Sequence, residues 1–532
     1  YVSNYQKNIF ALISNSRYIR DFFCGLCMAI AACGMFSCSD FLDEESHHAL
    51  PDTQNWKTLE DARSGLMGVY GLMRAALADN NTQWVCGELR LGDFHTDSRD
   101  DLDAIIHNDL NRNLSLVDHV ADWRRFYAVV NAASVYMEHV GAIVGQDMAY
   151  SEQNLKWDVA QARALRALAY FYMARIWGDV PLVTSSYDNG SFPQIGKSPS
   201  SSVLLYAKNE LLAAAEELPF QFGSDNNQYY RQSPSFWQGK LLNKLSVYAI
   251  LAHLSAWTGH YADAETYSAY VLDNYTQIGI GEEQICLDVE NVVSETGLFC
   301  GSTTTYAPYR LVAFNFVYKD NMDMTQSGHL EQWTLCKPYV QKLYPDLYVM
   351  KDSLAVIYGD FKDVRFGMDT ITHKYQSTYF DMNVSKPVFK KINVVQNGAG
   401  KDGDFAVFGS SILFSRMEDM MLLHVEALAA INRGDEAIQE LNEFRKYRGL
   451  ASLSFKKDFG SDIRKLINNI FEERRRELIG EGHRWYDLVR RQKILKDNPQ
   501  LLDLISNGGI YWPVSEEVIK QNSLIHQNPY WE

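Results

Sequence analysis

The sequence lacks the motifs of several common enzyme classes. It has no His-Glu-x-x-His zinc site, no Walker A loop for nucleotide phosphates and no Gly-x-Ser-x-Gly nucleophile turn. Gly279-Ile-Gly281 has neither a third glycine nor a strand–turn–helix context, so it does not predict a dinucleotide site. The paired carboxylates of glycoside hydrolases are defined by their separation in space, so the sequence leaves that chemistry open. We therefore expect a binding protein rather than an enzyme.

Positive charge is also scarce. Fifty Lys and Arg residues stand against 66 Asp and Glu residues, which gives a formal net charge of −16. Binding to nucleic acid or to anionic lipid headgroups requires concentrated Lys and Arg, so we expect neither as a partner. Aromatic residues are abundant at 13%, with 31 Tyr and 11 Trp among 532 residues. Aromatic rings stack on flat apolar faces such as those of sugars, so a neutral ligand or a protein partner fits this composition better.

Cysteine is rare outside one short N-terminal segment. Four of the eight cysteines lie between residues 24 and 38, and the others are Cys86, Cys286, Cys300 and Cys336. Cys24-x-x-Cys27 has no second pair at metal-site spacing, so we expect no cofactor. Clustered Asp residues in 93–103 make a structural calcium ion an alternative. The EF-hand order fails there, because Ile105 and Ile106 stand where an Asx and a Gly are needed.

The N-terminus reads as a secretion signal. Arg17 and Arg20 precede an apolar stretch, rich in small residues, that is somewhat short for a membrane-spanning helix. We expect a signal peptide over 1–37, lipidation at Cys38 and a tether over 38–58. Cys33 is the rival site, because Ile30-Ala-Ala-Cys33 resembles a lipoprotein cleavage motif more closely by residue type. Cys38 is preferred because polar and acidic residues follow it directly.

The remainder, 59–532, is expected to form a single, mainly α domain. Apolar residues recur at helical spacing over 59–77, 123–144, 158–177 and 203–218. Two stretches, 245–272 and 417–448, each predict a pair of helices joined by a glycine-containing turn, as in tetratricopeptide-like (TPR-like) repeats. We therefore expect a TPR-like scaffold over about 59–275 and 413–492. A loop-rich, partly β insertion is expected over about 276–412, and a C-terminal tail over 493–532.

The segment Phe471–Arg490 predicts a helix, a break at Gly480 and Gly482, and a second helix. It resembles the SusD/RagB signature E-R-x-x-E-L-x-x-E-G-x-R-W-x-D-L-x-R. Further stretches resemble that family in the same order along the chain, namely Cys38–Asp43, Ala162–Leu182, Asp363–Arg365, Ser415–Ala427, Leu441–Arg445, Trp512–Val514 and Asn522–Tyr530. The departures are Gly480 in place of a common aromatic, Val514 within P-I-P, and no Gly before Tyr530.

The resemblance implies a surface lipoprotein of the bacterial outer membrane with a SusD-like helical core. Such a protein captures an oligosaccharide or another nutrient and acts as a lid on a TonB-dependent, SusC-like transporter, without catalysis. Two alternatives remain open, a TPR-like scaffold that binds protein and no glycan, and a surface glycoside hydrolase. The charged residues of Phe471–Arg490 are expected to lock the C-terminal helices together rather than to contact ligand.

Sugar recognition requires exposed aromatic rings with planar polar groups beside them. We expect these outside the helical repeats, in an acidic loop over 84–103 and in the insertion. The candidate ligand-binding residues are Trp84, Asn81, Asp93, Tyr306, Tyr309 and Trp333. The tryptophans of the helices, such as Trp177 and Trp485, are expected to pack in the core.

Overall fold

Helices that follow one another along the chain also pack against one another. The computed structural model describes residues 56–188, 193–317, 323–398 and 405–532, and Lys57–Glu532 forms one compact unit. The expected signal peptide, Cys33, Cys38 and nearly all of the tether lie outside the described residues. The principal helices are α3 (Leu59–Ala78), α7 (Arg124–His139), α8 (Glu152–Trp177), α9 (Ser200–Glu217), α11 (Lys244–Trp257), α12 (Tyr261–Asn274), α16 (Met417–Ala430), α17 (Gly434–Tyr447), α19 (Ile463–Leu478) and α20 (Arg484–Leu495).

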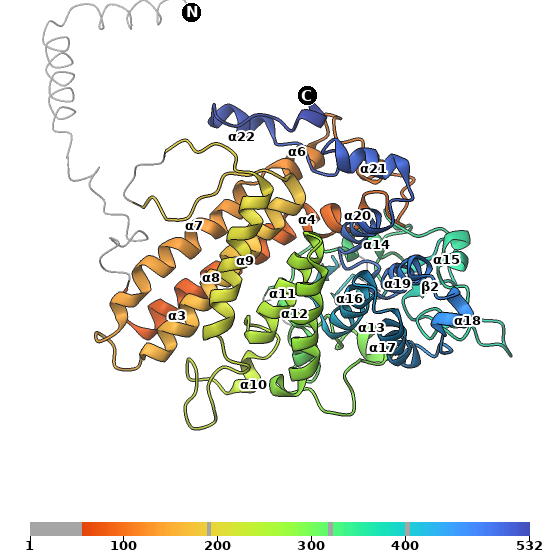
Figure 1. Cartoon of the computed structure of the whole chain (residues 1–532), viewed down its shortest axis with the longest axis horizontal. Helices are drawn as coiled ribbons and strands as arrows, with labels where there is room; N and C mark the ends of the chain where they lie inside the picture. The colour runs from red at the N-terminus through yellow and green to blue at the C-terminus, as the bar shows by residue number, and fades with distance from the viewer. Residues whose placement is uncertain (1–55, 189–192, 318–322, 399–404) are drawn as a thin grey trace, which may run out of the picture. The chain divides into compact units, whose positions relative to one another are not determined.

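These helices form one continuous array (Figure 1). α3 packs on α7, α7 on α8, α8 on α9, α9 on α11, α11 on α12, α12 on α16, and α16 on α17 and α19. The predicted helical hairpins are confirmed: α11 and α12 are joined at Gly259, and α16 and α17 at Asn432, both with positive φ. The mainly α, TPR-like fold class is therefore confirmed. None of the described helices combines the length and apolarity needed to cross a bilayer.

α8 is the central helix of the array. The Ser151 hydroxyl caps its N-terminus by accepting from the Asn154 amide at 3.1 Å, and it ends at Gly178, whose φ is 75°. Nearly every side chain in its C-terminal half is buried, so this half of the helix is enclosed by the rest of the protein. Arg166 is 7% exposed and donates to Glu210 at 2.6 Å. This ion pair offsets the cost of burying the guanidinium.

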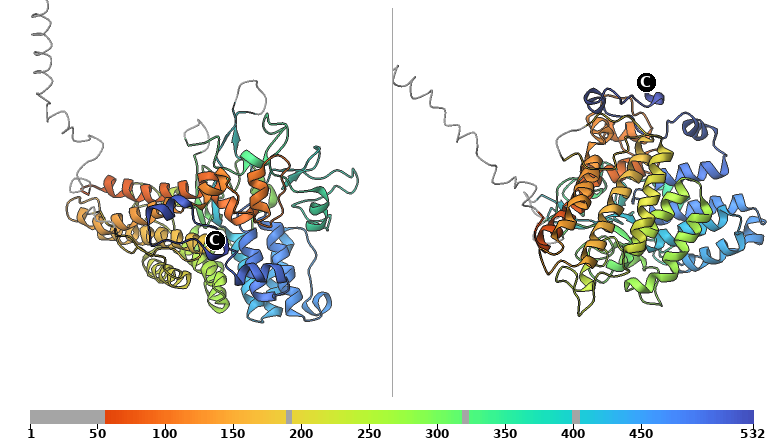
Figure 2. Two further views of the ribbon diagram at one scale, coloured as in Figure 1. Left: turned by 90° about the horizontal axis from the view of Figure 1, so that it is seen from above. Right: turned by 60° about the vertical axis from the view of Figure 1, so that its left-hand side comes forward.

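The insertion closes on itself through short antiparallel strands. β1 (Val312–Phe314) pairs with β6 (Ile412–Ser415), so the start and the end of the insertion meet, and β1 also packs against α3. β2 (Phe380–Asp381) pairs with β3 (Val388–Phe389), and β4 (Val395–Gln396) with β5 (Val407–Phe408). Figure 2 shows this segment, in green to teal, gathered on one side of the helices. The smaller helices of the insertion are α13 (Val289–Val293), η7 (Ala307–Tyr309), α14 (Glu331–Thr334) and α15 (Lys351–Ile357).

The expected acidic loop over 84–103 is wrong for much of its length. The chain forms α4 (Thr82–Trp84), a π-helical turn η4 (Val85–Leu89) and α5 (Asp100–Ile106). The reason is that polar side chains of this stretch bind distant backbone. The Glu88 carboxylate accepts from the amides of Gly480 and Gly482 at 2.8 and 2.9 Å, and Arg90 donates to the carbonyls of Gly509 and Ile510.

The remaining short helices flank these elements or complete the C-terminal tail. They are η3 (Asp79–Asn81), α6 (Ser115–Ala121), η5 (Val140–Ile143), α10 (Pro234–Trp237), η6 (Tyr275–Ile278), α18 (Phe455–Phe459), α21 (Pro499–Ser506), α22 (Glu516–Gln521) and η8 (Pro529–Trp531). The tail is fixed to the array, since the Trp512 amide donates to the Ile176 carbonyl at 2.7 Å and its side chain is 1% exposed. The four cysteines of the described chain are buried and unpaired.

The helix–glycine–helix prediction for Phe471–Arg490 is confirmed by α19 and α20. Gly480 has φ 81°, and a Cβ added there would lie 2.2 Å from Phe389 Cζ, so a larger residue does not fit. The acidic side chains of α19 face a set of buried guanidiniums. Glu477 accepts from Arg448 at 2.8 and 2.9 Å and from Arg416 at 2.9 Å. Burial alone would raise the pKa of Glu477, but these guanidiniums hold it well below its usual range.

A second buried cluster joins α19, α20 and α16. Asp487 accepts from Arg474 Nε at 2.9 Å and from Arg490 at 2.7 Å, and Arg490 also forms two 2.8 Å bonds with Glu426. All four side chains are almost completely buried. The signature residues therefore act inside the protein, as internal ion pairs between helices, which is the structural role that the sequence predicted.

Candidate ligand-binding site

A polar cavity opens where α3 ends. It has a volume of about 630 Å³, and we call it the asparagine cavity. Its lining combines side-chain amides, charged groups and aromatic rings from segments far apart in the sequence. The residues that matter for recognition are Asp79, Asn80, Asn81, Arg99, Phe316, Gln332 and Trp333.

The two asparagines reach the cavity because the chain turns sharply after α3. Asn80 and Asn81 have φ values of 49° and 54°, in the left-handed region that asparagine tolerates better than most side chains. Asn81 is 1% exposed, and its Oδ1 has no hydrogen-bond partner among the described residues. A buried amide oxygen without a partner costs about 1–3 kcal/mol. A hydroxyl donor entering the cavity would offset that cost.

The opposite wall comes from α14 and from the segment before α5. Trp333 on α14 lines the cavity but is only 4% exposed, so it does not offer an open platform for stacking. Arg99 lies 5.9 Å from that ring and is held by Asp101 through bonds of 2.9 and 2.7 Å. The amide of Gln332 is half-buried and makes no side-chain hydrogen bond to the described chain, so it can bind a ligand.

This set of groups suits an uncharged polyol. Amides and carboxylates accept and donate to hydroxyl groups, and aromatic carbons pack on the apolar face of a sugar ring. The cavity also contains Ser115, whose hydroxyl lies 3.1 Å from His119 Nδ1. That nitrogen is 2.6 Å from the Ser115 carbonyl, to which it donates, so it is not free to act as a base. The arrangement can therefore bind a polyol, and His119 does not activate Ser115 as a nucleophile.

Two of the six candidate residues, Asn81 and Trp333, meet in this cavity. Trp84 is 2% exposed within α4, so its expected position in an exposed loop is wrong. Tyr309 is 8% exposed and donates to the Gln284 carbonyl at 2.6 Å, while the Tyr306 hydroxyl donates to Asn291 at 2.8 Å. Trp84 and Tyr309 are therefore buried, and the half-buried Tyr306 uses its hydroxyl in an internal hydrogen bond.

Asp93 was expected to offer hydrogen bonds to ligand, and its surroundings do not fit that expectation. Its carboxylate accepts from Arg475 Nε at 3.0 and 3.1 Å and lies 3.3 Å from Arg484. The side chain is 6% exposed and joins the segment between η4 and α5 to α19 and α20. Asp93 therefore belongs to the buried ion pairs and not to the cavity.

The sequence missed five of the seven residues named for the cavity: Asp79, Asn80, Arg99, Phe316 and Gln332. The Asn80-Asn81 pair directly after a helix was a usable signal, since paired asparagines favour left-handed turns. Phe316 and Gln332 carry no such signal, because only the pairing of β1 with β6 and the packing of the insertion bring them to α3.

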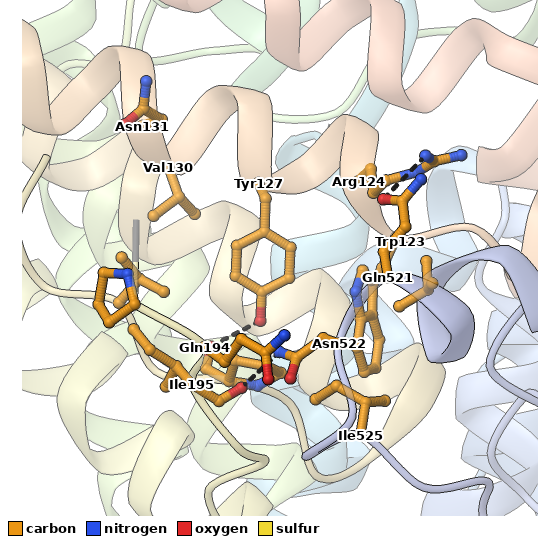
Figure 3. A pocket seen from close by; sticks show the side chains of 14 residues that line it. Trp123, Arg124, Tyr127, Val130, Asn131, Gln194, Ile195, Gln521, Asn522 and Ile525 are labelled. Atoms are coloured by element: carbon orange, nitrogen blue, oxygen red, sulfur yellow. Dashed lines mark hydrogen bonds between the residues drawn. The ribbon is translucent and has the colours of Figure 1, made fainter. Parts of the chain in front are cut away.

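A second cavity of about 500 Å³ lies between α7, α22 and the segment around Ile195 (Figure 3). Its walls are mainly apolar, with Trp123 and Tyr127 at the centre. The polar groups here hold chain segments together: the Tyr127 hydroxyl donates to the Pro181 carbonyl at 2.6 Å, and Asn522 donates to the Ile195 carbonyl at 3.0 Å. Fewer polar groups are therefore free for a sugar than in the asparagine cavity.

Within the described ranges, one group of side chains has the composition of a metal site. Ligand atoms of Glu138, His139 and Asp188 lie within 4.8 Å of one another. Glu138 already accepts from the Ser186 amide at 2.8 Å, and His139 Nε2 lies 2.6 Å from Asp188. Internal hydrogen bonds satisfy these groups, so they need no ion.

Comparisons with known proteins agree with the helical fold. A model of the SusD family matches residues 370–531. A SusD-like protein of Formosa agariphila is 25% identical over 93% of this chain and 96% of its own length. A SusD superfamily protein of Bacteroides thetaiotaomicron, solved as a crystal structure, is 55% identical over 90% of this chain and 100% of that chain, with a TM-score of 0.82. A laminarin-binding SusD-like protein shares the fold, at 20% identity over 89% of this chain and 100% of that chain, with a TM-score of 0.63. With this fold, these buried ion pairs and a relative of such identity along its length, the chain belongs to the SusD family.

Proposed function

We propose that this protein is a non-enzymatic, cell-surface lipoprotein that binds glycans in the asparagine cavity. It would pass the bound oligosaccharide to a TonB-dependent, SusC-like transporter in the outer membrane. Lipidation at Cys38 would anchor it there. The role of the transporter, the location and the anchor rest on family membership, whereas the binding site rests on the residues of the cavity.

One observation carries the proposal. Asn81 has a buried carbonyl oxygen with no partner among the described residues, and it lines a cavity that also contains Trp333 and the amide of Gln332. Unsatisfied buried polar atoms are uncommon in native proteins, and a ligand is one explanation of such an atom. A sugar hydroxyl provides the missing donor, and its ring carbons fit the aromatic wall.

The family comparison supports the ligand class without naming the sugar. One structural relative is described as laminarin-binding, and its 20% identity is too low to carry a specific glycan to this chain. The acidic composition, with its net charge of −16, agrees with a ligand other than nucleic acid.

The test begins with affinity electrophoresis against a panel of soluble polysaccharides that includes laminarin, starch and pectin. Oligosaccharides of a retained polysaccharide are then titrated calorimetrically. Asn81→Gly removes the amide while glycine keeps the positive φ, so the backbone can stay as it is. We expect this variant to bind about 10-fold more weakly, since one hydrogen bond to a buried group is lost.

Asn131→Ala is the matched control. Asn131 is an exposed asparagine that lines the cavity of Figure 3, so its loss should leave glycan affinity unchanged. Two results would contradict the proposal. Retention of no glycan, together with co-purification of a barrel-sized membrane protein, would favour the interaction scaffold. Release of shorter sugars from a bound polysaccharide would favour the hydrolase.

A further inference from the structure

A groove with unbalanced positive charge runs along α3 beside the asparagine cavity. It has a volume of about 580 Å³, and we call it the α3 groove. Its floor is one face of α3, where Arg63 and Arg74 stand three turns apart, about 16 Å along the axis. The other walls come from α10 and from the segment around Phe316.

The two cavities share a wall. Phe316 lines both of them, and α3 continues from the groove at Arg63 to the asparagine cavity at Ala78. The β1–β6 pair that packs on α3 holds Phe316 in this position. An extended ligand seated in the asparagine cavity would therefore continue along α3 into the groove.

Arg74 is the one cation of the groove that has a close carboxylate. It forms a two-pronged ion pair with Asp323 and also donates to the Asn315 carbonyl at 2.8 Å. Its guanidinium lies 4.5 Å from the Phe316 ring. The charges of Arg74 and Asp323 cancel, so this ion pair adds no net charge to the groove.

Arg63 is only weakly paired, and Lys240 has no carboxylate partner among the described residues. The nearest carboxylate to Arg63 is Glu60, at 3.7 Å and 56% exposed, which gives a weak and solvent-screened pair. The Lys240 ammonium has no ion pair with any carboxylate of the described residues and lies 3.7 Å from the Phe236 ring instead. Burial and the nearby Arg310 lower the pKa of Lys240.

Arg310 adds to the same positive field. It is 2% exposed and donates to the carbonyls of Leu298, Cys300 and Thr303, with no carboxylate within ion-pair distance in the described chain. A protein with a net charge of −16 thus has an excess of positive charge at one groove next to its ligand cavity. The weakly paired Arg63 and the unpaired Lys240 lie beside the aromatic rings of Trp237 and Phe236. This combination suits an anionic sugar, whose ring carbons pack on the aromatic rings while its anionic group contacts the cationic nitrogens.

We propose that the α3 groove is a subsite for an acidic sugar residue, so that the preferred ligand is an oligosaccharide carrying carboxylate or sulfate groups. This inference rests on the proposed function. Arg63 and Lys240 would contact the anionic group, while the asparagine cavity would hold an adjoining residue of the same chain. Because the contact is electrostatic, added salt should weaken it.

The experiment uses two matched pairs of oligosaccharides. One pair is oligogalacturonate and its carboxyl-reduced form, and the other is a sulfated galactan oligosaccharide and its desulfated form. We expect the anionic member of at least one pair to bind about 10-fold more tightly than its neutral partner, which corresponds to one charge-assisted contact. Whichever pair shows the preference identifies the anionic group that the subsite binds, carboxylate or sulfate.

Lys240→Gln and Arg63→Gln should each remove most of that preference and leave the affinity for the neutral member unchanged. Lys156→Gln is the control, since Lys156 is 59% exposed outside the groove and the change in net charge is the same. Arg63 is 34% exposed on α3, so this second variant remains informative if Lys240→Gln lowers the stability of the fold.

Equal binding of both members, or a preference that survives both substitutions, would overturn the acidic-sugar subsite. Failure of both pairs to bind, while a neutral glycan of the panel binds and depends on Asn81, would also overturn it and leave the proposed function standing. Failure of every glycan would overturn both.

Discussion

Removing Asp487 should destabilise the protein without touching its ligand site. Asp487 is 3% exposed and is shared by Arg474 and Arg490, at 2.9 and 2.7 Å. Asp487→Ala leaves two buried guanidiniums without this carboxylate, and the loss of one partner from a buried ion pair costs about 3–5 kcal/mol. Both arginines keep other carboxylates, Asp419 for Arg474 and Glu426 for Arg490, so the lower value of about 3 kcal/mol applies.

The expected change in melting temperature follows from the size of the folded unit. Unfolding entropy is about 2.1 cal/mol/K per residue, so a unit of this length has about 1 kcal/mol/K. A loss of about 3 kcal/mol then lowers Tm by about 3 °C. Differential scanning fluorimetry and urea denaturation measure the change, and calorimetric titration checks that glycan affinity is retained.

Asp497→Ala is the matched control for that experiment. Asp497 also binds an arginine in a two-pronged pair, to Arg491 at 2.9 and 2.8 Å, but it is 40% exposed. A surface pair contributes about 0–1 kcal/mol, so Tm should fall by no more than about 1 °C. Equal effects of the two substitutions, or loss of glycan binding by a stable Asp487→Ala protein, would refute the structural role of the signature cluster.

Two further predictions concern a buried carboxyl and the anchor. Burial raises the pKa of Glu331 to about 7, and its Oε2 has no hydrogen-bond partner in the described chain. A raised pKa in the folded state gives stability that is present below about pH 4.5 and is lost as the pH rises through about 7. Glu331→Gln should therefore be more stable than the wild type at pH 8, by roughly 3 kcal/mol, with no gain at pH 4.5; equal urea midpoints at pH 8 would contradict this. Separately, Cys38→Ala should release the protein from the membrane fraction, and continued lipid labelling of that variant would point to Cys33.

The helical scaffold could be predicted because its signals are local. Apolar spacing within 158–177 or 245–272 predicts a helix whatever the rest of the chain does. The turns at Gly259 and Asn432 follow from residues that tolerate positive φ. Local sequence rules were therefore enough to predict the helices of the array from α3 to α20.

The expected loop over 84–103 was wrong because its stabilising contacts are long-range. A glutamate and an arginine in a polar stretch normally indicate a solvated surface. Here Glu88 binds amides near residue 480, and Arg90 binds carbonyls near residue 510. No spacing rule within the stretch contains these partners. The same holds for Asp93, whose partners lie on α19 and α20.

The ligand cavity was predicted only in part, again because its residues are far apart in the sequence. Asn81 and Trp333 were both named as candidates, but 252 positions separate them, and no local pattern predicts that they lie together. The position of a tryptophan in the sequence does not show whether it lines a cavity or lies in the core. Trp84 and Trp333 have similar exposed fractions, 2% and 4%. What distinguishes Trp333 is the free volume beside it, which depends on how the insertion packs on α3.

The most direct test of glycan binding in the asparagine cavity is a crystal structure of the protein with an oligosaccharide of the polysaccharide that it retains most strongly. Our account predicts electron density for sugar against Trp333, with a hydroxyl group within hydrogen-bond distance of Asn81 Oδ1. Sugar bound only in the cavity of Figure 3, or elsewhere on the surface, with the asparagine cavity empty, would contradict it.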